Sequence, residues 1–296
     1  MDCIVSSSGG NLIMQRLINI SKLEKEKVRR IIPSSNTFQN GTNLLETYDE
    51  LYSSLSAGED GYLILEPGIY DLSVKSLSLR GKIHIIGEDD DSKPLIRSRT
   101  SSFESATINN KSSESIILQN LEIMNYDRYY TNPALAPNTK PVALSVWRSF
   151  SVNPCAYKFS KSGVSHKLIN VDFSAMNSEI LALEIGLDIE DSSTYINCTS
   201  NSYFSFGSIL KSCTGYYEKC KAEFGSFGSF STSVKGVFKD CAAKNTSFGY
   251  AADSIEAAFS NCEIVVSENE EGEGFGLNSK NNKGYYENCK IVKEQI

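Results

Sequence analysis

The chain has 296 residues, of which 40% are hydrophobic, so it can bury a sizeable core as one elongated domain or two compact ones. Its 29 Lys and Arg against 36 Asp and Glu give a formal charge of -7, and such a surface makes nucleic acid a poor candidate partner. Eight cysteines are too few for a disulfide scaffold in a chain of this length.

Residues 1–42 carry no repeat and no recognisable targeting signal. Residues 1–8 contain Asp2 and no basic stretch, and the apolar run after them is interrupted by Gln15 and Arg16, so we expect no signal peptide and no membrane span. Synthesis in a reducing cytoplasm would then keep the thiols free. Residues 12–32 join apolar positions to a basic segment at residues 22–30. They predict either an arm that anchors the protein to a neighbour or a locally packed terminus.

A helix is expected over residues 43–58, as a cap on the first coil of the region that follows. Asn43 and Glu46 are spaced as a capping box, and Gly58 is placed to end the helix. Residues 62–65, 69–72 and 83–87 then read as the first strands. The apolar positions of the helix recur at helical spacing: Leu44, Leu45, Tyr48, Leu51, Tyr52 and Leu55.

From residue 195 onward a unit of about 21 residues is repeated. Five segments place an aromatic residue three positions before a cysteine, and these cysteines lie 22, 21, 21 and 27 residues apart. A Phe-Gly marker recurs in step, at intervals of 21, 21 and 27, so both series predict one insertion around residues 267–274. The markers are Cys198, Cys220, Cys241, Cys262 and Cys289, together with Phe206, Phe227, Phe248 and Phe275.

The repeat predicts a solenoid of short parallel strands over residues 59–296, with an irregular, proline-containing excursion at residues 126–161. An aromatic residue and a cysteine that both point inward, with two residues between them, require a bend, because side chains alternate along a straight strand. Asn tolerates the left-handed conformation of such a bend. A stacked ladder is therefore expected at this corner, formed by Asn120, Asn170, Asn197, Asn261 and Asn288.

The order of a helix, "GYLILEPGIYDL", "KIHIIGED" and "IILQNLEIMN" resembles the opening of the pectin-lyase-like right-handed β-helix superfamily, over roughly residues 43–296. This resemblance implies an all-β fold, a right-handed parallel β-helix with an N-terminal capping helix. The repeat itself, close to Gly-x-Phe-x-Asn-Cys-x-Ala-x-x-x-Ser-Phe-Gly, is similar to arrays in tail-fibre and appendage proteins of bacteriophages and other viruses.

A β-helix hosts many functions, so chemistry must be argued from individual sites. The resemblance implies that a polysaccharide lyase would combine clustered acids for calcium with an Arg or Lys base. It also implies that a polygalacturonase-like hydrolase would carry Asn-x-Asp, Asp-Asp, Gly-His-Gly and Arg-x-Lys elements. All eight arginines lie at or before Arg148, and the set of four elements is incomplete. The histidines, His84 and His166, have no nucleophile partner that the sequence identifies.

Several other residues are candidates, each with a purely structural alternative. Acidic side chains could form the carboxylate pair of a glycosidase or could be a solvated surface. The acids at residues 268–273 could bind calcium or lie in a solvated insertion. Aromatic residues of the excursion could stack on sugars or pack on the solenoid. The acids are Asp172 with Glu184, and Asp188 with Glu190 and Asp191; the aromatics are Tyr129, Tyr130, Trp147, Phe150, Tyr157 and Phe159.

The repeated cysteines occur once per coil, so they form a core column rather than the convergent ligand set that zinc needs. Cys3, Cys155 and Cys213 carry no recognisable motif, and no metal or cofactor is expected.

Two hypotheses remain. The first is a non-enzymatic structural or attachment protein of a virion, which binds other virion proteins through residues 1–42 and could form a homo-oligomer such as a trimer. The alternative is a carbohydrate-active enzyme, a polysaccharide lyase or glycoside hydrolase, with a glycan ligand and an unrecognised carboxylate site.

Overall fold

The structure of the chain is a computed structural model that describes residues 18–99, 106–125, 155–159, 163–175, 190–200, 206–207, 210–222, 227–229, 231–244, 247–266 and 274–293. Most of the expected excursion at residues 126–161 and nearly all of the expected insertion at residues 267–274 lie outside these residues.

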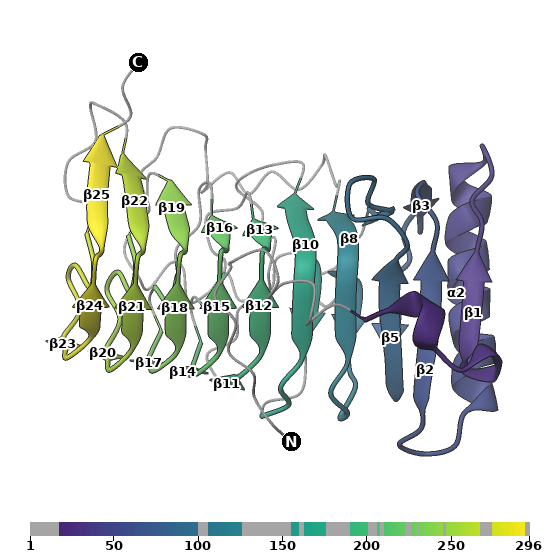
Figure 1. The fold of residues 1–296 in the computed structure, drawn as a ribbon, viewed down its shortest axis with the longest axis horizontal. Coiled ribbons are helices and arrows are strands. Elements are labelled where there is room, and N and C mark those ends of the chain that lie inside the picture. Colours follow the sequence, from purple (N-terminus) through teal and green to yellow (C-terminus); the bar gives the residue numbers. More distant parts are fainter. Residues whose placement is uncertain are drawn as a thin grey trace.

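The chain winds into coils that follow one another along the long axis of the molecule (Figure 1). Each strand pairs in parallel with the equivalent strand of the next coil, so Phe238 lies beside Tyr217 on one side and Phe259 on the other. Within the described residues these strands form sheets of 17, 5 and 3 members. The prediction of a parallel β-helix is therefore confirmed.

The N-terminal coils contain the helices and the longer strands, whereas the C-terminal coils repeat three short strands. The N-terminal elements are η1 Ile20–Lys22, η2 Lys25–Lys27, β1 Val28–Ile31, α2 Thr37–Ser54, β2 Asp60–Leu65, β3 Ile69–Asp71, β4 Leu77–Leu79, β5 Lys82–Gly87, β6 Leu95–Ser98, β7 Ala106–Asn110, β8 Ile117–Asn125, β9 Cys155–Phe159 and β10 Lys167–Ala175. The C-terminal elements are β11 Glu190–Asp191, β12 Thr194–Ile196, β13 Thr199–Ser200, β14 Ser212–Cys213, β15 Tyr216–Glu218, β16 Lys221–Ala222, β17 Ser233–Val234, β18 Val237–Lys239, β19 Ala242–Lys244, β20 Ser254–Ile255, β21 Ala258–Ser260, β22 Glu263–Val266, β23 Asn281–Asn282, β24 Tyr285–Glu287 and β25 Lys290–Lys293.

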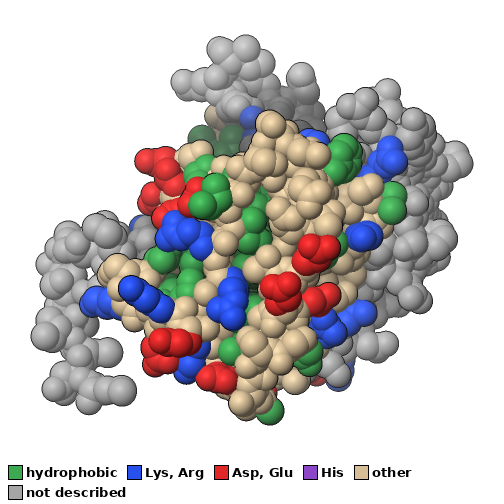
Figure 2. Space-filling view, turned by 90° about the vertical axis from the view of Figure 1, so that its right-hand side faces the viewer, with side chains coloured by type: hydrophobic (Ala, Val, Ile, Leu, Met, Phe, Trp, Pro, Cys, Tyr) green, Lys and Arg blue, Asp and Glu red, His purple; other side chains and the backbone are tan. Residues whose placement is uncertain are grey.

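The capping helix α2 begins earlier than the expected residue 43 and ends at Ser54. The side chain of Asn36 accepts a hydrogen bond from the Gln39 N–H at 3.1 Å and so caps the first turn, which the apolar spacing from Leu44 onward could not reveal. Gly41 lies inside the helix where it crosses β3, and a Cβ there would come within 2.0 Å of the Asp71 carbonyl oxygen. Only glycine permits this approach. The end of the molecule at which α2 lies shows acidic, basic and hydrophobic side chains intermingled (Figure 2).

The described residues before α2, from Ile18 onward, are part of the solenoid, although an arm was expected over residues 1–42. Strand β1 pairs in parallel with β2, and the Ile18 N–H donates to Gln119 Oε1 at 2.8 Å across three coils. Two basic residues used for the arm prediction form ion pairs with acids of the first coils: Lys27 lies 3.3 Å from Glu59, and Arg30 lies 3.4 Å from Glu66. Residues 1–17 lie outside the described residues, and their anchoring role stays a prediction.

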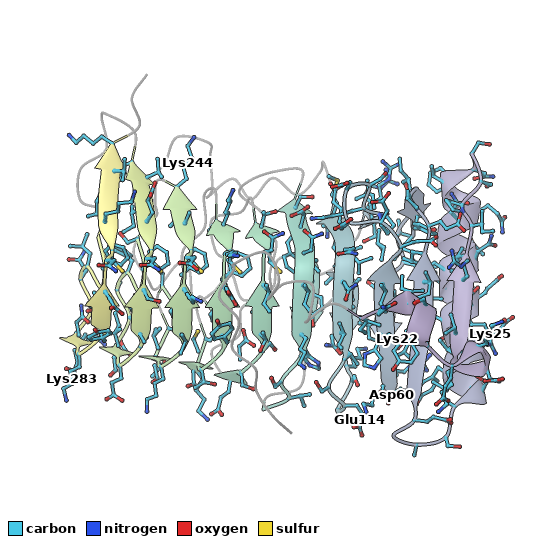
Figure 3. All side chains as sticks on the ribbon, in the orientation of Figure 1. Lys22, Lys25, Asp60, Glu114, Lys244 and Lys283 are labelled. Carbon is cyan, nitrogen blue, oxygen red and sulfur yellow. The ribbon has the colours of Figure 1, made fainter. Side chains whose placement is uncertain are left out.

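Two perpendicular stacks of aromatic rings fill the C-terminal coils. Tyr195 to Tyr286 form one stack with centroids 4.7 to 5.0 Å apart, and Phe206 to Phe275 form the other at 4.6 to 5.2 Å. Charged side chains such as Lys244 and Lys283 instead point away from the coils (Figure 3). Within the described part of the chain, no helix is both long enough and apolar enough to cross a membrane.

One residue forms the corner between the two strands of each coil, and it has the left-handed backbone conformation in every coil from Asn120 to Asn288. Their side chains form the expected ladder: Asn170 donates to Asn120 at 3.1 Å, and Asn197 donates to Asn170 at 3.0 Å. Lys219 interrupts the ladder. It resumes at Asp240, which accepts from Asn261 at 2.9 Å, and Asn261 accepts from Asn288 at 3.3 Å.

Candidate functional site

Two carboxylates face solvent side by side on neighbouring strands of the largest sheet. Glu122 on β8 lies directly across from Asp172 on β10, and each comes two residues after a corner asparagine. Both are half-buried, while their neighbours on either side, such as Leu121 and Ile123, point into the core. Like charges opposite one another destabilise a sheet. A pair of this kind therefore marks a candidate functional site.

Asp172 is held by one cation and one hydroxyl group. Lys93 Nζ lies 2.6 Å from Asp172 Oδ2, and Thr199 Oγ1 on β13 donates to Asp172 Oδ1 at 2.5 Å. Each carboxylate oxygen thus has a strong donor, which fixes the position of the group.

Glu122 has a different environment, although it lies on the next strand. Burial and then the negative charge of Asp172 raise the pKa of Glu122, while Lys93 acts in the opposite direction. The two carboxyl groups therefore differ in environment: Asp172 is ion-paired with Lys93, whereas the raised pKa of Glu122 favours its protonated form.

The same outward row shows what an ordinary acidic residue looks like on this surface. The row continues from Asp172 through Thr199, Lys221 and Ala242 to Glu263. Glu263 faces an opposite charge, since Lys290 Nζ lies 2.7 Å from its carboxylate. Glu263 thus faces a lysine in the neighbouring coil, whereas Glu122 faces another acid, Asp172.

A loop of three aspartates lies close to the pair, in the connection between β5 and β6. The carboxylates of Asp89, Asp90 and Asp91 come within 4.8 Å of one another, and they are the one convergent group of potential metal ligands in the described part of the chain. Asp89 Oδ1 accepts from the Asp91 N–H at 2.8 Å and the Ser92 N–H at 3.3 Å. These bonds account for the turn, and the carboxylates could hold a hard cation.

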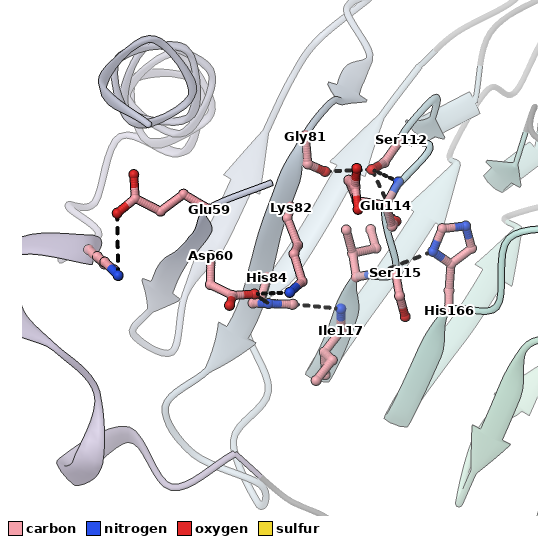
Figure 4. Close-up of polar contacts among 12 residues, drawn as sticks. Glu59, Asp60, Gly81, Lys82, His84, Ser112, Glu114, Ser115, Ile117 and His166 are labelled. Atoms are coloured by element: carbon pink, nitrogen blue, oxygen red, sulfur yellow. Dashed lines mark hydrogen bonds and ion pairs between the residues drawn. The ribbon is translucent and has the colours of Figure 1, made fainter. Parts of the chain in front are cut away.

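His84 links three strands and is not a free base (Figure 4). Its Nδ1 accepts from the Ile117 N–H at 3.0 Å, so its proton lies on Nε2, which is 3.0 Å from Asp60 Oδ1. Lys82 Nζ also lies 3.0 Å from Asp60. Burial lowers the pKa of His84, and the ring is 4% exposed. Both nitrogens are engaged, which gives His84 a structural role.

His166 lies two coils further along than His84, just before β10, and is also buried. Burial lowers the pKa of His166 to about 4, so the ring is neutral near pH 7. Its Nδ1 accepts a long bond of 3.4 Å from the Ile116 N–H, and its Nε2 has no hydrogen-bond partner within the described residues. Glu190, another candidate, forms an ion pair with Lys211 at 2.9 Å. Neither His166 nor Glu190 contributes to the carboxylate site.

Asp191 lies inside the core rather than on the flank where the sequence suggested an acid pair. The hydroxyl groups of Tyr217 and Tyr195 donate to its Oδ2 at 2.9 and 3.1 Å, and the Ser193 N–H donates to its Oδ1 at 2.9 Å. Burial raises the pKa of Asp191. The pairing of Asp188 with Glu190 and Asp191 as a surface site is therefore wrong for Asp191.

The remaining candidates are mostly internal or outside the described residues. Tyr157 is 1% exposed and accepts from Asn110 Nδ2 at 2.9 Å, so it cannot serve as a sugar platform. Those outside the described residues are Cys3, Tyr129, Tyr130, Trp147, Phe150, Glu184, Asp188 and the acids at residues 268–273, and of Cys155 and Phe159 only the backbone is described.

The cysteines of the column are packed as core residues. Cys198, Cys220, Cys241 and Cys262 are at most 1% exposed, and Cys289 is half-buried in the last described coil. Their thiols donate to backbone carbonyls, as from Cys198 to Leu168 at 3.3 Å. Cys213 instead lies beside the Tyr217 hydroxyl at 3.3 Å.

The sequence signal for Glu122 was present but was not used. Asp172 was a candidate with Glu184, whereas its partner across the sheet is Glu122. The two weak copies around Asn120 and Asn170 place Glu122 and Asp172 at the same position after the corner. Aligning those copies would have predicted the pair. Lys93 comes from a loop between two strands, and no repeat identifies it.

No known protein-family model matches the chain, and no curated protein sequence matches it. Among solved structures it is similar to a pectin methylesterase mutant in complex with a hexasaccharide, at 12% identity and a TM-score of 0.50, over 92% of this chain and 94% of that one. It is also similar to pectin methylesterase PemA from Erwinia chrysanthemi, at 12% identity and a TM-score of 0.38, over 92% of this chain and 67% of that one. A pectin methylesterase in complex with another hexasaccharide gives 15% identity and a TM-score of 0.39 over the same shares.

The prediction of a non-enzymatic virion component was wrong, because the solved structure that resembles this chain at a TM-score of 0.50 is that of an enzyme. The tail-fibre resemblance of the repeat gains no support from this structure. An identity of 12% shows the fold alone, so any activity must be argued from the site. The fold of this chain is the right-handed parallel β-helix of pectin-lyase-like proteins.

Proposed function

We propose that this chain is a carbohydrate-active hydrolase whose reacting groups are Glu122 and Asp172. The observation that carries the proposal is the pair itself: two neighbouring, solvent-facing carboxyl groups, of which Glu122 has a raised pKa and Asp172 is held by Lys93 and Thr199. Hydrolysis of a glycosidic bond requires one carboxylic acid and one carboxylate.

The environments suggest the roles. Glu122, whose pKa is raised, donates its proton to the leaving oxygen of the substrate. Asp172, held by Lys93 and Thr199, uses a carboxylate oxygen to form a bond with the reacting carbon as the bond to the leaving oxygen breaks. Water, deprotonated by Glu122, then releases the product and restores both groups.

The spacing of the strands favours this two-step route. Neighbouring strands lie about 4.8 Å apart, which is close to the roughly 5–5.5 Å between the carboxyl groups of retaining glycosidases. Inverting enzymes need a wider gap to admit a water molecule. We therefore expect retention of configuration at the reacting carbon.

The proposal is tested by turnover on a panel of neutral, acidic and methyl-esterified polysaccharides. Release of reducing ends would report glycosidic cleavage, and release of methanol would report the ester hydrolysis for which the similar structures are named. We expect Glu122→Gln and Asp172→Asn each to lower kcat by about 100-fold or more, because each removes a reacting group.

The matched control is Glu263→Gln, which removes an acid from the same outward row, where it pairs with Lys290. This variant should retain wild-type kcat. Absence of turnover by the wild-type chain across the panel would count against the proposal, as would activity that survives both Glu122→Gln and Asp172→Asn.

A further inference from the structure

The loop at residues 88–94 is tied to the coils that carry the carboxylate pair at three points. The Glu122 N–H donates to the Pro94 carbonyl oxygen at 3.0 Å, and Asn170 Nδ2 donates to the Asp90 carbonyl oxygen at 3.4 Å. Lys93 Nζ makes the third contact, at 2.6 Å from Asp172 Oδ2. The loop therefore belongs to the site, although it lies outside the repeat.

Lys93 is unlike the other lysines that form ion pairs on this face. Its side chain is 16% exposed, whereas that of Lys290, in the pair with Glu263, is 64% exposed. An ion pair with little solvent around it is screened weakly, so its charge acts more strongly on its neighbours.

Few charges act on Glu122. Across the sheet, β10 presents Asp172 and β6 presents the apolar Leu95, and the loop presents Lys93. Lys93 is thus the cation that offsets the negative charge of the two adjacent carboxyl groups. Without it, two like charges would lie opposite one another on neighbouring strands with no cation beside them.

We infer that Lys93 is a positioning residue that assigns the two roles, because its ammonium group lies against Asp172 and leaves Glu122 as the proton donor. This inference rests on the proposed function. Lys93 itself need not touch the substrate. Its effect is to distinguish two carboxyl groups that the sheet places in equivalent positions.

The first experiment needs no substrate. The side-chain carboxyl groups of Glu122 and Asp172 are followed by carbon-13 NMR during a pH titration of the full chain and of Lys93→Met. Loss of the neighbouring cation should move both titration midpoints to higher pH, by about one to three pH units in total. Unchanged midpoints in a folded Lys93→Met variant would overturn the inference.

Two further variants separate charge from packing. Lys93→Arg keeps the cation and should restore the midpoints. Lys221→Met removes an exposed lysine from the same outward row, two strands beyond Asp172, and should leave the midpoints unchanged. A shift with Lys221→Met equal to that with Lys93→Met would also contradict the specific role of Lys93.

The second experiment uses the hydrolytic activity. Activity needs one carboxyl group ionised and the other protonated, so both limbs of the pH profile of kcat should move to higher pH in Lys93→Met. A titration shift without a shift in the pH profile would overturn the assignment of roles. Failure of the proposed function would look different, since the wild-type chain would then show no turnover at all.

Discussion

In the aromatic stack from Tyr195 to Tyr286, a tyrosine occurs where the residue four positions earlier can hydrogen-bond to its hydroxyl group. Tyr286 donates to Asn282 at 2.8 Å, and Tyr217 reaches both Cys213 and Asp191. Phe238 and Phe259, which lack the hydroxyl, follow apolar residues instead. A buried hydroxyl without a partner is costly, so the choice between Tyr and Phe is made separately at each coil. The matched positions are Asp191 with Tyr195, Cys213 with Tyr217, Val234 with Phe238, Ile255 with Phe259, and Asn282 with Tyr286.

This matching can be tested by adding a hydroxyl in the wrong coil. Phe238→Tyr should lower the free energy of unfolding by about 1–3 kcal/mol, because the new hydroxyl would face Val234 in a fully buried site. Adding Val234→Asn supplies the partner that Asn282 gives Tyr286. Thermal or urea unfolding of both single variants and the double variant should give a cost for the double smaller than the sum. Additive costs would argue against the matching.

The capping helix shows how an element can be recognised and still be misplaced. Its apolar face was read correctly from Leu44, Tyr48 and Leu51, which are all buried. The start of the helix was predicted wrongly, because the true cap, Asn36, precedes Leu44, the first apolar position used for the prediction, by about two turns. Gly41 lies inside the helix, where its close packing on β3 requires a glycine.

Replacement of the two candidate caps distinguishes the expected start from the observed one. Asn36→Ala should lower the unfolding free energy by about 1 kcal/mol, since it removes the acceptor for the Gln39 N–H. Asn43→Ala removes only an exposed bond from the Gln39 side chain and should cost much less. Melting temperatures of the two variants provide the comparison, and an equal loss would favour the start at residue 43.

At the scale of the whole molecule, each coil contacts mainly the coils on either side of it. Folding should therefore depend more on the strand register between coils than on the number of coils. Deletion of residues 221–241 removes one whole coil and joins Cys220 to Ala242, which occupies the position of Lys221 in the next coil. We expect this variant to fold with the same circular dichroism spectrum and a modest loss in melting temperature. Deletion of residues 221–236 breaks the register and should prevent cooperative unfolding. The idea fails if the two deletions behave alike.

The repeat made the C-terminal coils predictable, because Cys241 and Phe248 recur with equivalents one coil away on both sides. Asp191 was misplaced, although it precedes Tyr195 by the same four residues that separate Val234 from Phe238. The carboxylate pair joins strands that are 50 residues apart in sequence, and the chain between them carries no marker. Lys93 depends on how one loop packs, which local sequence does not determine.

The broken ladder at the corner gives the coils a direction. An amide can accept from one neighbour and donate to the other, but an ionised carboxylate can only accept. Asp240 can therefore begin a column of amides, which Asn261 and Asn288 extend, yet it cannot continue the column that ends at Asn197. Lys219 stands in the coil between them, where no acceptor is required. Coils that look interchangeable thus have a fixed order, and exchanging two of them would leave one column without its first acceptor.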